Sequence, residues 1–325
     1  MKPKHSLSLL FITIVFLTAC TLIGSPKLER PRPPLKFAYS SWVGYFPTAI
    51  AQEKGFFTAQ GVKVQTFYLE ADEPQLANLV AGKYDGMTAP LGNVVSVGAN
   101  NLNLRVVLKI DQSDGADVVV AQPQIQSVLD LKGKKIGVDL GKFGELFVTR
   151  MLETSGLSTA QVTLLKANED QVVTRLQTNE IQAGHTWEPF ASKAVKSGAR
   201  VLFTSKQTPG LIPDVIVFRE QVLRDRPADI RAFVRAWFQA VEYWQSNPKE
   251  GNAIIGKVLN IPPETISLEG VKLLTLSENQ QGFTSNNSTD SLYYTAQLYI
   301  NFFVRTGGLT RPPDINQLLD PSFLK

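Results

Sequence analysis

Short apolar runs alternate with helix-like patterns along most of the chain after residue 34. Alternation of this kind predicts α/β sheets covered by helices. A first series has strands expected at 35–39, 62–69 and 105–110 and helices at 47–57, 74–82 and 93–99; a second has strands at 134–139 and near 201–204 and helices at 145–154 and 170–178. The chain is therefore expected to hold two similar α/β units.

Two stretches of sequence resemble each other, one in each series. They are residues 76–86 (LANLVAGKYDG) and 173–183 (VTRLQTNEIQA). In each, a helix is expected to close at Gly82 or Asn179 in a left-handed cap, and a short strand follows. If the units repeat one another, the ends of these two strands face the same space between the units. Chance similarity between two helix-turn-strand segments is the alternative.

Two apolar segments that begin with aspartate, 117–121 and 214–218, have the pattern of strands that cross between the units. A chain that leaves by the first and returns by the second forms a two-strand hinge. We therefore expect lobe 1 to contain residues 36–116 and 215–325 and lobe 2 to contain residues 117–214. An amphipathic helix at 227–245 and a helix near 291–304 would belong to lobe 1, where the apolar stripe of the former serves core packing.

The beginning of the chain has a different pattern. Two lysines precede an apolar run over 7–17 that is too short to span a bilayer as a helix, and small residues lead into Cys20. This order is typical of a secretory signal over residues 1–19, and Leu17-Thr18-Ala19-Cys20 resembles the bacterial lipoprotein lipobox, whose cysteine receives a lipid. A transmembrane anchor and a buried structural cysteine are the alternatives. Prolines across 20–35 predict a semi-rigid tether.

Charge and cysteine content limit the function further. Removal of residues 1–19 would leave 306 residues, with 31 basic and 29 acidic side chains, so nothing indicates a nucleic-acid partner. Cys20 is the only cysteine, which excludes a disulfide within the chain. The fold must rest on a hydrophobic core, and 43% apolar residues suffice for one.

Two strand-to-helix junctions carry groups that could hold a small solute. The first, 40–47, ends in a proline suited to the first turn of a helix, and the second, 139–145, contains two glycines and Lys142. Unpaired N–H groups and the helix dipole attract an anion or a polar group, and the glycines let the backbone approach it. An ordinary turn and a solvated lysine are the alternatives.

These junctions and the segments around them resemble the type II periplasmic solute-binding proteins of ABC importers, in the branch for nitrate, sulfonates, taurine and thiamine-precursor pyrimidines. The likeness covers nearly all of the chain after the tether. It rests on the order and spacing of 42–47 (WVGYFP), 51–57 (AQEKGFF), 61–64 (GVKV), 115–117 (GAD), 129–138 (LDLKGKKIGV) and 187–189 (WEP). The resemblance implies a two-lobe type II α/β fold with a two-strand hinge, a permease partner, no cofactor and a monomer.

The resemblance also implies a solute held between the lobes. The residues expected around it are Ser41, Trp42, Tyr45, Thr88 and Pro90 from one side, Gly141, Lys142, Phe143, Gly144, Trp187 and Glu188 from the other, and Asp117 and Asp214 near the hinge. The two tryptophans could stack on a planar solute, and Glu145 and Glu188 could accept hydrogen bonds from an amine or ring N–H. Core packing of the tryptophans and a helix-start charge at Glu145 are the alternatives.

The implied solute is small and polar or anionic, like nitrate, a sulfonate or taurine. Several of the expected groups are acidic, which costs affinity for a bare anion and favours a larger polar or zwitterionic organic solute. An aromatic nitrogen heterocycle, such as a thiamine-precursor pyrimidine, is the alternative.

An enzyme on the same scaffold is the main rival, because pyrimidine synthases resemble these binders. His185 is the one histidine after residue 19, and the chain has no histidine pair at metal spacing, no P-loop and no G-x-S-x-G element. A structural or adhesive lipoprotein without cargo is a third class. We expect a non-enzymatic, exported, lipid-anchored solute-binding protein without a metal site.

Overall fold

Two β-sheets organise the chain from residue 34 onward in the computed structural model, which describes residues 1, 32–69, 75–98 and 103–325. The chain divides into a unit Met1–Pro33 and a unit Pro34–Lys325, and both sheets lie in the second. The expected signal segment, Cys20 and most of the expected tether lie outside the described residues. Within the described residues, no helix combines the length and the apolar character needed to cross a membrane.

The first sheet has six strands in the order β11-β4-β10-β3-β1-β2. They are β1 (Leu35–Tyr39), β2 (Val64–Tyr68), β3 (Gly86–Pro90), β4 (Leu104–Ser113), β10 (Pro213–Arg219) and β11 (Val271–Leu273). β1 pairs in parallel with β2 and β3, and β10 runs antiparallel between β3 and β4. The three central strands β3, β4 and β10 are almost wholly buried, as strands covered on both faces require.

The second sheet has five strands in the order β7-β6-β8-β5-β9. They are β5 (Val118–Ala121), β6 (Lys135–Val138), β7 (Thr163–Lys166), β8 (Ala183–Thr186) and β9 (Arg200–Thr204). β6 pairs in parallel with β7 and β8, and β5 runs antiparallel between β8 and β9. The arrangement of β6, β7, β8 and β5 therefore repeats that of β1, β2, β3 and β10.

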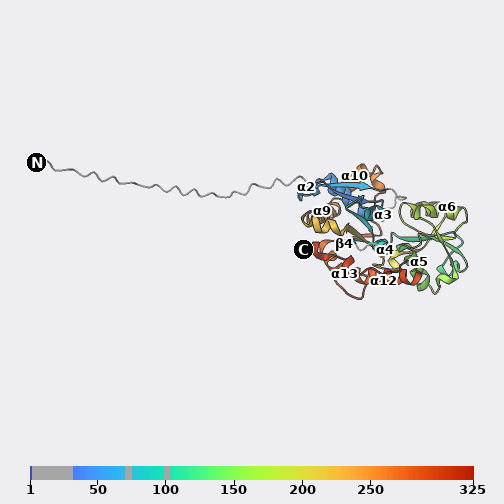
Figure 1. Ribbon diagram of the computed structural model, residues 1–325. Helices are drawn as coiled ribbons and strands as arrows, with labels where there is room; N and C mark the ends of the chain where they lie inside the picture. The colour runs from blue at the N-terminus through green and yellow to red at the C-terminus, as the bar shows by residue number, and fades with distance from the viewer. Residues whose placement is uncertain (2–31, 70–74, 99–102) are drawn as a thin grey trace. The chain divides into compact units, whose positions relative to one another are not determined.

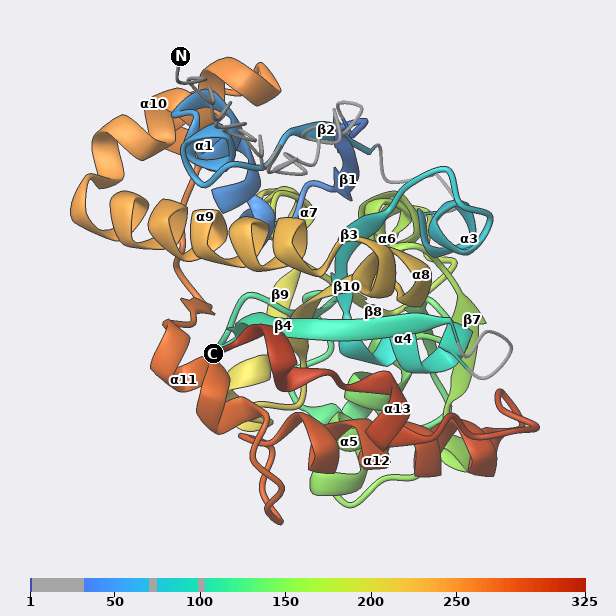
Figure 2. The same cartoon turned by 60° about the vertical axis from the view of Figure 1, so that its left-hand side comes forward.

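Helices accompany both sheets. Those with the first sheet are α1 (Pro47–Glu53), α2 (Phe56–Ala59), α3 (Gln75–Val80), α4 (Leu91–Gly98), α8 (Glu220–Asp225), α9 (Pro227–Ser246), α10 (Pro248–Leu259), α11 (Leu276–Gly282), α12 (Leu292–Thr306) and α13 (Ile315–Leu318); those with the second are α5 (Phe143–Thr154), α6 (Val172–Gln177) and α7 (Phe190–Lys196). Figure 1 shows α5 and α6 together on one side, and Figure 2 shows α9 and α10 beside α1. The helices predicted at 227–245 and near 291–304 are confirmed as α9 and α12.

The two stretches that resemble each other in sequence hold the same place in the two sheets. The first contains α3 and leads into β3 beside β1, and the second contains α6 and leads into β8 beside β6. Gly82 and Asn179 follow these helices with φ of 80° and 60°, the left-handed conformation that the sequence predicted. The similarity therefore has a structural counterpart at the level of helix, cap and strand.

Two short segments connect the sheets. Residues 114–117 lead from β4 to β5, and residues 205–212 lead from β9 to β10, beginning with a 3₁₀ helix, η5 (Ser205–Gln207). The segments predicted to cross between the units, 117–121 and 214–218, instead supply β5 of the second sheet and most of β10 of the first. The Ser113 and Ser205 hydroxyls lie 2.8 Å apart, and the Gly115 N–H donates to Ser205 Oγ at 2.6 Å. The two connections are thus hydrogen-bonded to each other.

The hydrophobic core is continuous from one sheet to the other through α4, α5 and α12. Gly92 in α4 permits this close approach, because a Cβ at that position would lie 2.5 Å from Tyr299 Cε1 and 2.9 Å from Phe143 Cβ. Phe143 begins α5, and Tyr299 lies in α12. The packing holds the start of α5 against the first sheet's helices, beside the site described next.

Candidate ligand-binding site

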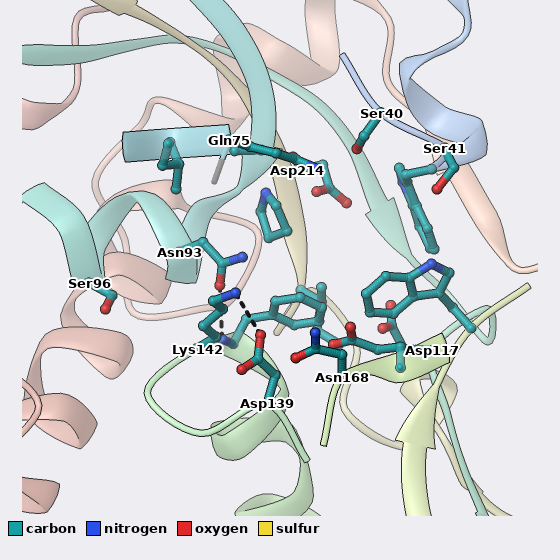
Figure 3. Close-up of a pocket in the computed structure, with 18 of the residues that line it drawn as sticks. Ser40, Ser41, Gln75, Asn93, Ser96, Asp117, Asp139, Lys142, Asn168 and Asp214 are labelled. Atoms are coloured by element: carbon teal, nitrogen blue, oxygen red, sulfur yellow. Dashed lines mark hydrogen bonds and ion pairs between the residues drawn. The ribbon is translucent and has the colours of Figure 1, made fainter. Parts of the chain in front are cut away.

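Loops from both sheets line a cavity of about 410 Å³, a size typical of small-molecule sites. The lining residues are Ser40, Ser41, Trp42, Tyr45, Gln75, Leu76, Ala77, Ala89, Pro90, Asn93, Ser96, Val97, Ile212 and Asp214 around the first sheet, and Asp117, Asp139, Leu140, Gly141, Lys142, Phe143, Asn168, Glu169, Asp170, Trp187 and Phe190 around the second. Figure 3 shows Ser40, Ser41 and Asp214 across the cavity from Asp139 and Asn168.

The position of the cavity follows from strand direction. The parallel strands β1, β3, β6, β7 and β8 all direct their carboxyl ends toward it, so the residues that follow each strand meet there. Ser40 follows β1, Asp139 follows β6 and Trp187 follows β8. Ligands of open α/β sheets bind at this edge because loops, not strands, supply the contacts.

Three aromatic rings form one wall of the cavity. The centroids of Trp42 and Trp187 lie 6.4 Å apart with perpendicular ring planes, and Phe143 lies 6.0 Å from Trp187 at an angle of 30°. Trp42 comes from the first sheet and the other two from the second, so the wall is built from both. Aromatic faces of this kind suit a flat, apolar or conjugated ligand surface.

Carboxyl groups dominate the charge of the lining. Asp117, Asp139, Glu169, Asp170 and Asp214 all line the cavity, whereas Lys142 is the one basic residue among the described residues that do so. Lys142 Nζ lies 2.6 Å from Asp139 Oδ2, and the side chain of Asp139 is only 7% exposed. The lysine charge is therefore already balanced by a buried neighbour, and the cavity as a whole is negative.

Asp214, which lines the cavity, is one of a pair of buried aspartates. Asp111 and Asp214 are opposite each other in the register of β4 and β10; Trp42 Nε1 donates to Asp111 at 3.1 Å, and the Tyr45 hydroxyl donates to Asp214. Burial raises the pKa of Asp111 to about 7, and burial together with the Asp111 charge raises the pKa of Asp214 well above its usual range. Burial and the mutual repulsion of the two charges therefore favour the protonated form of at least one carboxyl.

The backbone donors at the start of α5 are largely used within the protein. The Gly141 N–H donates to Glu145 Oε2 at 2.7 Å, and the Phe143 N–H donates to Asn93 Oδ1 at 3.1 Å. Asn93 lies in α4 beside the first sheet, and the Ser96 hydroxyl of the same helix donates to the Gly141 carbonyl at 3.0 Å. These two contacts from α4 join the two sheets at one side of the cavity.

The structure brings most of the predicted site residues together. Those that line the cavity are Ser41, Trp42, Tyr45, Pro90, Asp117, Gly141, Lys142, Phe143, Trp187 and Asp214. Four others lie off its wall. Thr88 is fully buried within β3, Gly144 packs on His185, Glu145 caps the Gly141 N–H, and Glu188 accepts from the Ser192 hydroxyl at 2.9 Å.

Several lining residues were not predicted. Ser40, Gln75, Asn93, Ser96, Asp139, Asn168, Glu169, Asp170 and Phe190 are the polar or aromatic members of this group. Ser40 directly follows a predicted strand and Asp139 ends one, and both begin the junctions 40–47 and 139–145, so their position at a strand end could have identified them. Asn168 and Glu169 follow β7, a four-residue strand that the apolar pattern did not reveal.

Solved structures show the class of fold. The chain is similar to the periplasmic aliphatic sulphonate-binding protein SsuA of Escherichia coli, with a TM-score of 0.72 and 17% identity over 88% of this chain and 92% of that one. It is also similar to the nitrate-binding protein NrtA of Synechocystis PCC 6803 (TM-score 0.70, 14% identity, 89% and 86% covered) and to the desulfurization enzyme DSZB (TM-score 0.66, 15% identity, 89% and 97% covered). The predicted type II periplasmic-binding-protein fold is confirmed, and the fold is shared by binders and an enzyme.

Sequence comparison defines the family. Residues 43–251 match the NMT1/THI5-like family, and the chain belongs to it. A Brucella abortus (strain 2308) protein named "Putative binding protein" is 26% identical over 86% of this chain and 88% of its own length. A "Putative thiamine biosynthesis protein" of Haemophilus influenzae is 27% identical over 62% and 65%, and the riboflavin-binding protein RibY of Chloroflexus aurantiacus is 24% identical over 100% and 99%.

Proposed function

We propose that this chain is the solute-binding component of an ABC importer and that its ligand is a planar nitrogen heterocycle with N–H donors or a positive charge. The single observation that carries the proposal is the lining of the cavity, where carboxyl groups surround an aromatic wall and the one lysine is paired. Aromatic faces hold a flat ring, and carboxylates accept hydrogen bonds from its edge.

A small anion such as nitrate or a sulfonate suits this cavity poorly. The groups expected to hold it were the N–H groups at the two junctions, 40–47 and 139–145, and the Lys142 ammonium. The Gly141 and Phe143 N–H groups donate to Glu145 and Asn93, and the ammonium lies against Asp139. An anion would also stand among several carboxyl groups, which costs affinity through like-charge repulsion.

The names of two relatives agree with a heterocyclic ligand. One is named for riboflavin binding and the other for thiamine biosynthesis, and both compounds contain planar nitrogen rings. A binding role is favoured over an enzymatic one because His185, the only imidazole of the described residues, is fully buried and does not line the cavity. It is therefore poorly placed to exchange a proton with a bound solute.

The proposal includes export, anchoring and lobe closure. We propose that residues 1–19 direct export, that Cys20 carries a lipid anchor, and that residues 20–35 hold the protein away from the membrane. The lobes, 36–116 with 215–325 and 117–214, would close on the solute because it touches both, and the closed form would dock on a permease. Metabolic labelling with a radioactive fatty acid tests the anchor, since a Cys20→Ser chain should remain unlabelled.

The ligand class is tested by calorimetry and thermal shift on the purified full chain. The panel should contain 4-aminopyrimidine, riboflavin, nitrate, taurine and an alkanesulfonate. A ligand present at 100 times its dissociation constant stabilises the folded chain by about 2.7 kcal/mol, which raises the melting temperature measurably. Binding of a heterocycle and not of nitrate or the alkanesulfonate supports the proposal. Tight binding of nitrate or the alkanesulfonate alone would refute it.

A further inference from the structure

Glu169 stands out among the acidic residues of the cavity because its carboxyl is mostly buried and, within the described part of the chain, forms no ion pair with a lysine or an arginine. It begins the 3₁₀ helix η4 (Glu169–Gln171), separated from the end of β7 by two residues, and its side chain is 14% exposed. The Thr186 hydroxyl donates to the Glu169 carbonyl at 3.0 Å and fixes its backbone against β8. Asp139, by contrast, is balanced by Lys142 at 2.6 Å, and Asp170 is exposed.

The side chain beside the Glu169 carboxyl that can carry a positive charge is the imidazole of His185, which lies in β8 and is fully buried. Its Nε2 is 2.9 Å from Asp117 Oδ1, and its Nδ1 is 3.9 Å from Glu169 Oε1, beyond hydrogen-bond distance. Nδ1 has no hydrogen-bond partner among the described residues, although it is buried. The imidazole thus lies between two carboxyl groups that line the cavity, with a hydrogen bond to Asp117 and with Nδ1 facing Glu169.

Packing fixes the position of this imidazole. Its ring centroid lies 5.3 to 5.8 Å from those of Phe143, Phe147 and Trp187. Gly144 lies against it as well, because a Cβ there would be 2.6 Å from Nδ1. The ring therefore cannot turn away from Glu169 without disturbing the aromatic wall, and the unpartnered Nδ1 stays directed at the cavity's acidic edge.

We propose, on the basis of the function proposed above, that Glu169 determines specificity by accepting the N–H or cationic edge of the heterocycle, and that His185 is a positioning residue that links it to Asp117. A buried carboxylate without a close cation is costly, whereas the same carboxylate beside a ligand cation or N–H donor gains a charge-assisted hydrogen bond. The bound ligand thus supplies the cation or N–H donor for the Glu169 carboxylate.

The charges around Glu169 give this arrangement a pH dependence. Burial raises the pKa of Glu169 to about 7; the neighbouring His185, the residue's own backbone N–H and Lys142 lower it, and Asp139 raises it. His185 lies in β8, Lys142 lies at the start of α5, and Asp139 directly follows β6. Asp170 is the next residue after Glu169 in η4. A bound cation or N–H donor favours the ionised carboxyl, so near pH 6.5 binding releases a proton from Glu169 to the solvent.

The test is titration calorimetry of the full chain with 4-aminopyrimidine between pH 5.5 and 8.5, in pairs of buffers that differ in ionisation enthalpy. Glu169→Gln should bind at least tenfold more weakly at pH 8 and should lose the proton release seen with the unmodified chain near pH 6.5. Glu242→Gln, which changes an exposed acid of α9 that does not line the cavity, is the matched control and should retain both properties. Titration of the free ligand is the same for every chain and cancels in the comparison, so a difference in proton release between chains reports Glu169 together with the ligand edge that it faces.

His185→Asn tests the positioning role. It should shift the midpoint of the affinity–pH profile and leave some binding, whereas a purely structural histidine would change the melting temperature without moving that midpoint. Equal affinity and equal proton release in the unmodified and Glu169→Gln chains would overturn this inference and leave the proposed function standing. Failure of the unmodified chain to bind any heterocycle would overturn both.

Discussion

Replacing Glu169 by glutamine should make the ligand-free protein more stable at alkaline pH. The carboxyl is mostly buried, and burial raises its pKa from the ordinary value of 4.5 to about 7. Between these two pH values the folded chain holds a proton that the unfolded chain has released. Stability therefore falls as the pH rises through this window, because the folded chain must bury an ionised group.

The size of the effect follows from the distance between the two pKa values. A separation from 4.5 to about 7 corresponds to about 3 kcal/mol of unfolding free energy once the pH is above 7. Glutamine keeps the shape of the side chain and carries no charge. Its stabilising effect should be complete near pH 8, fall below about 1 kcal/mol at pH 5 and vanish at lower pH.

Urea unfolding followed by tryptophan fluorescence at pH 5, 6, 7 and 8 measures this dependence. Asp170→Asn is the control, since an exposed acid should change stability by no more than about 0.5 kcal/mol at any pH. A Glu169→Gln chain whose stability relative to the unmodified chain is the same at pH 5 and pH 8 would refute the reasoning, because the buried charge would then cost nothing.

Three further changes test the site and its supports. Trp187→Ala should weaken heterocycle binding by about 1–3 kcal/mol in calorimetry, and unchanged affinity in a folded chain would remove this ring from the site. Asn93→Ala should lower the unfolding free energy by about 1 kcal/mol, because α5 loses its cap from α4; an unchanged urea midpoint would contradict that role. Gly44→Ala should lower the melting temperature, since its Cβ would lie 2.0 Å from Asp111 Oδ2, and a chain with unchanged melting would show that the Asp111 carboxyl moves aside freely.

The sequence predicted the fold well because the local signals agreed with one another. Gly82 and Asn179 both close a helix with positive φ, and each leads into a buried strand beside the first strand of its sheet. Helix α9 was predicted within a residue or two, since Pro227 starts it and its apolar stripe is buried. Such features depend only on neighbouring residues, which a single sequence displays.

The site was predicted in part, and its gaps have physical reasons. Helix α5 begins at Phe143, two residues before the predicted start, so Gly144 lies in the first turn and Glu145 folds back to cap Gly141. Glu169 was missed because β7 is short and its residues are only partly buried or exposed, which leaves no clear apolar run. The hydrogen bond from the Phe143 N–H to Asn93 joins residues that are 50 positions apart, so no pattern of neighbouring residues could predict it.

The hydroxyl pair of Ser113 and Ser205 has a mechanical consequence. The Ser205 hydroxyl also accepts the Gly115 N–H of the other connection at 2.6 Å, and the Ser113 hydroxyl accepts the Asp117 N–H of its own connection at 3.0 Å. The two connections between the sheets are therefore held side by side by hydrogen bonds, so a bend in one connection must be accompanied by a bend in the other at the same position. If one sheet rotates relative to the other, the paired connections would restrict that rotation to one axis. The opposing walls of the cavity would then come back to the same alignment each time the sheets approach.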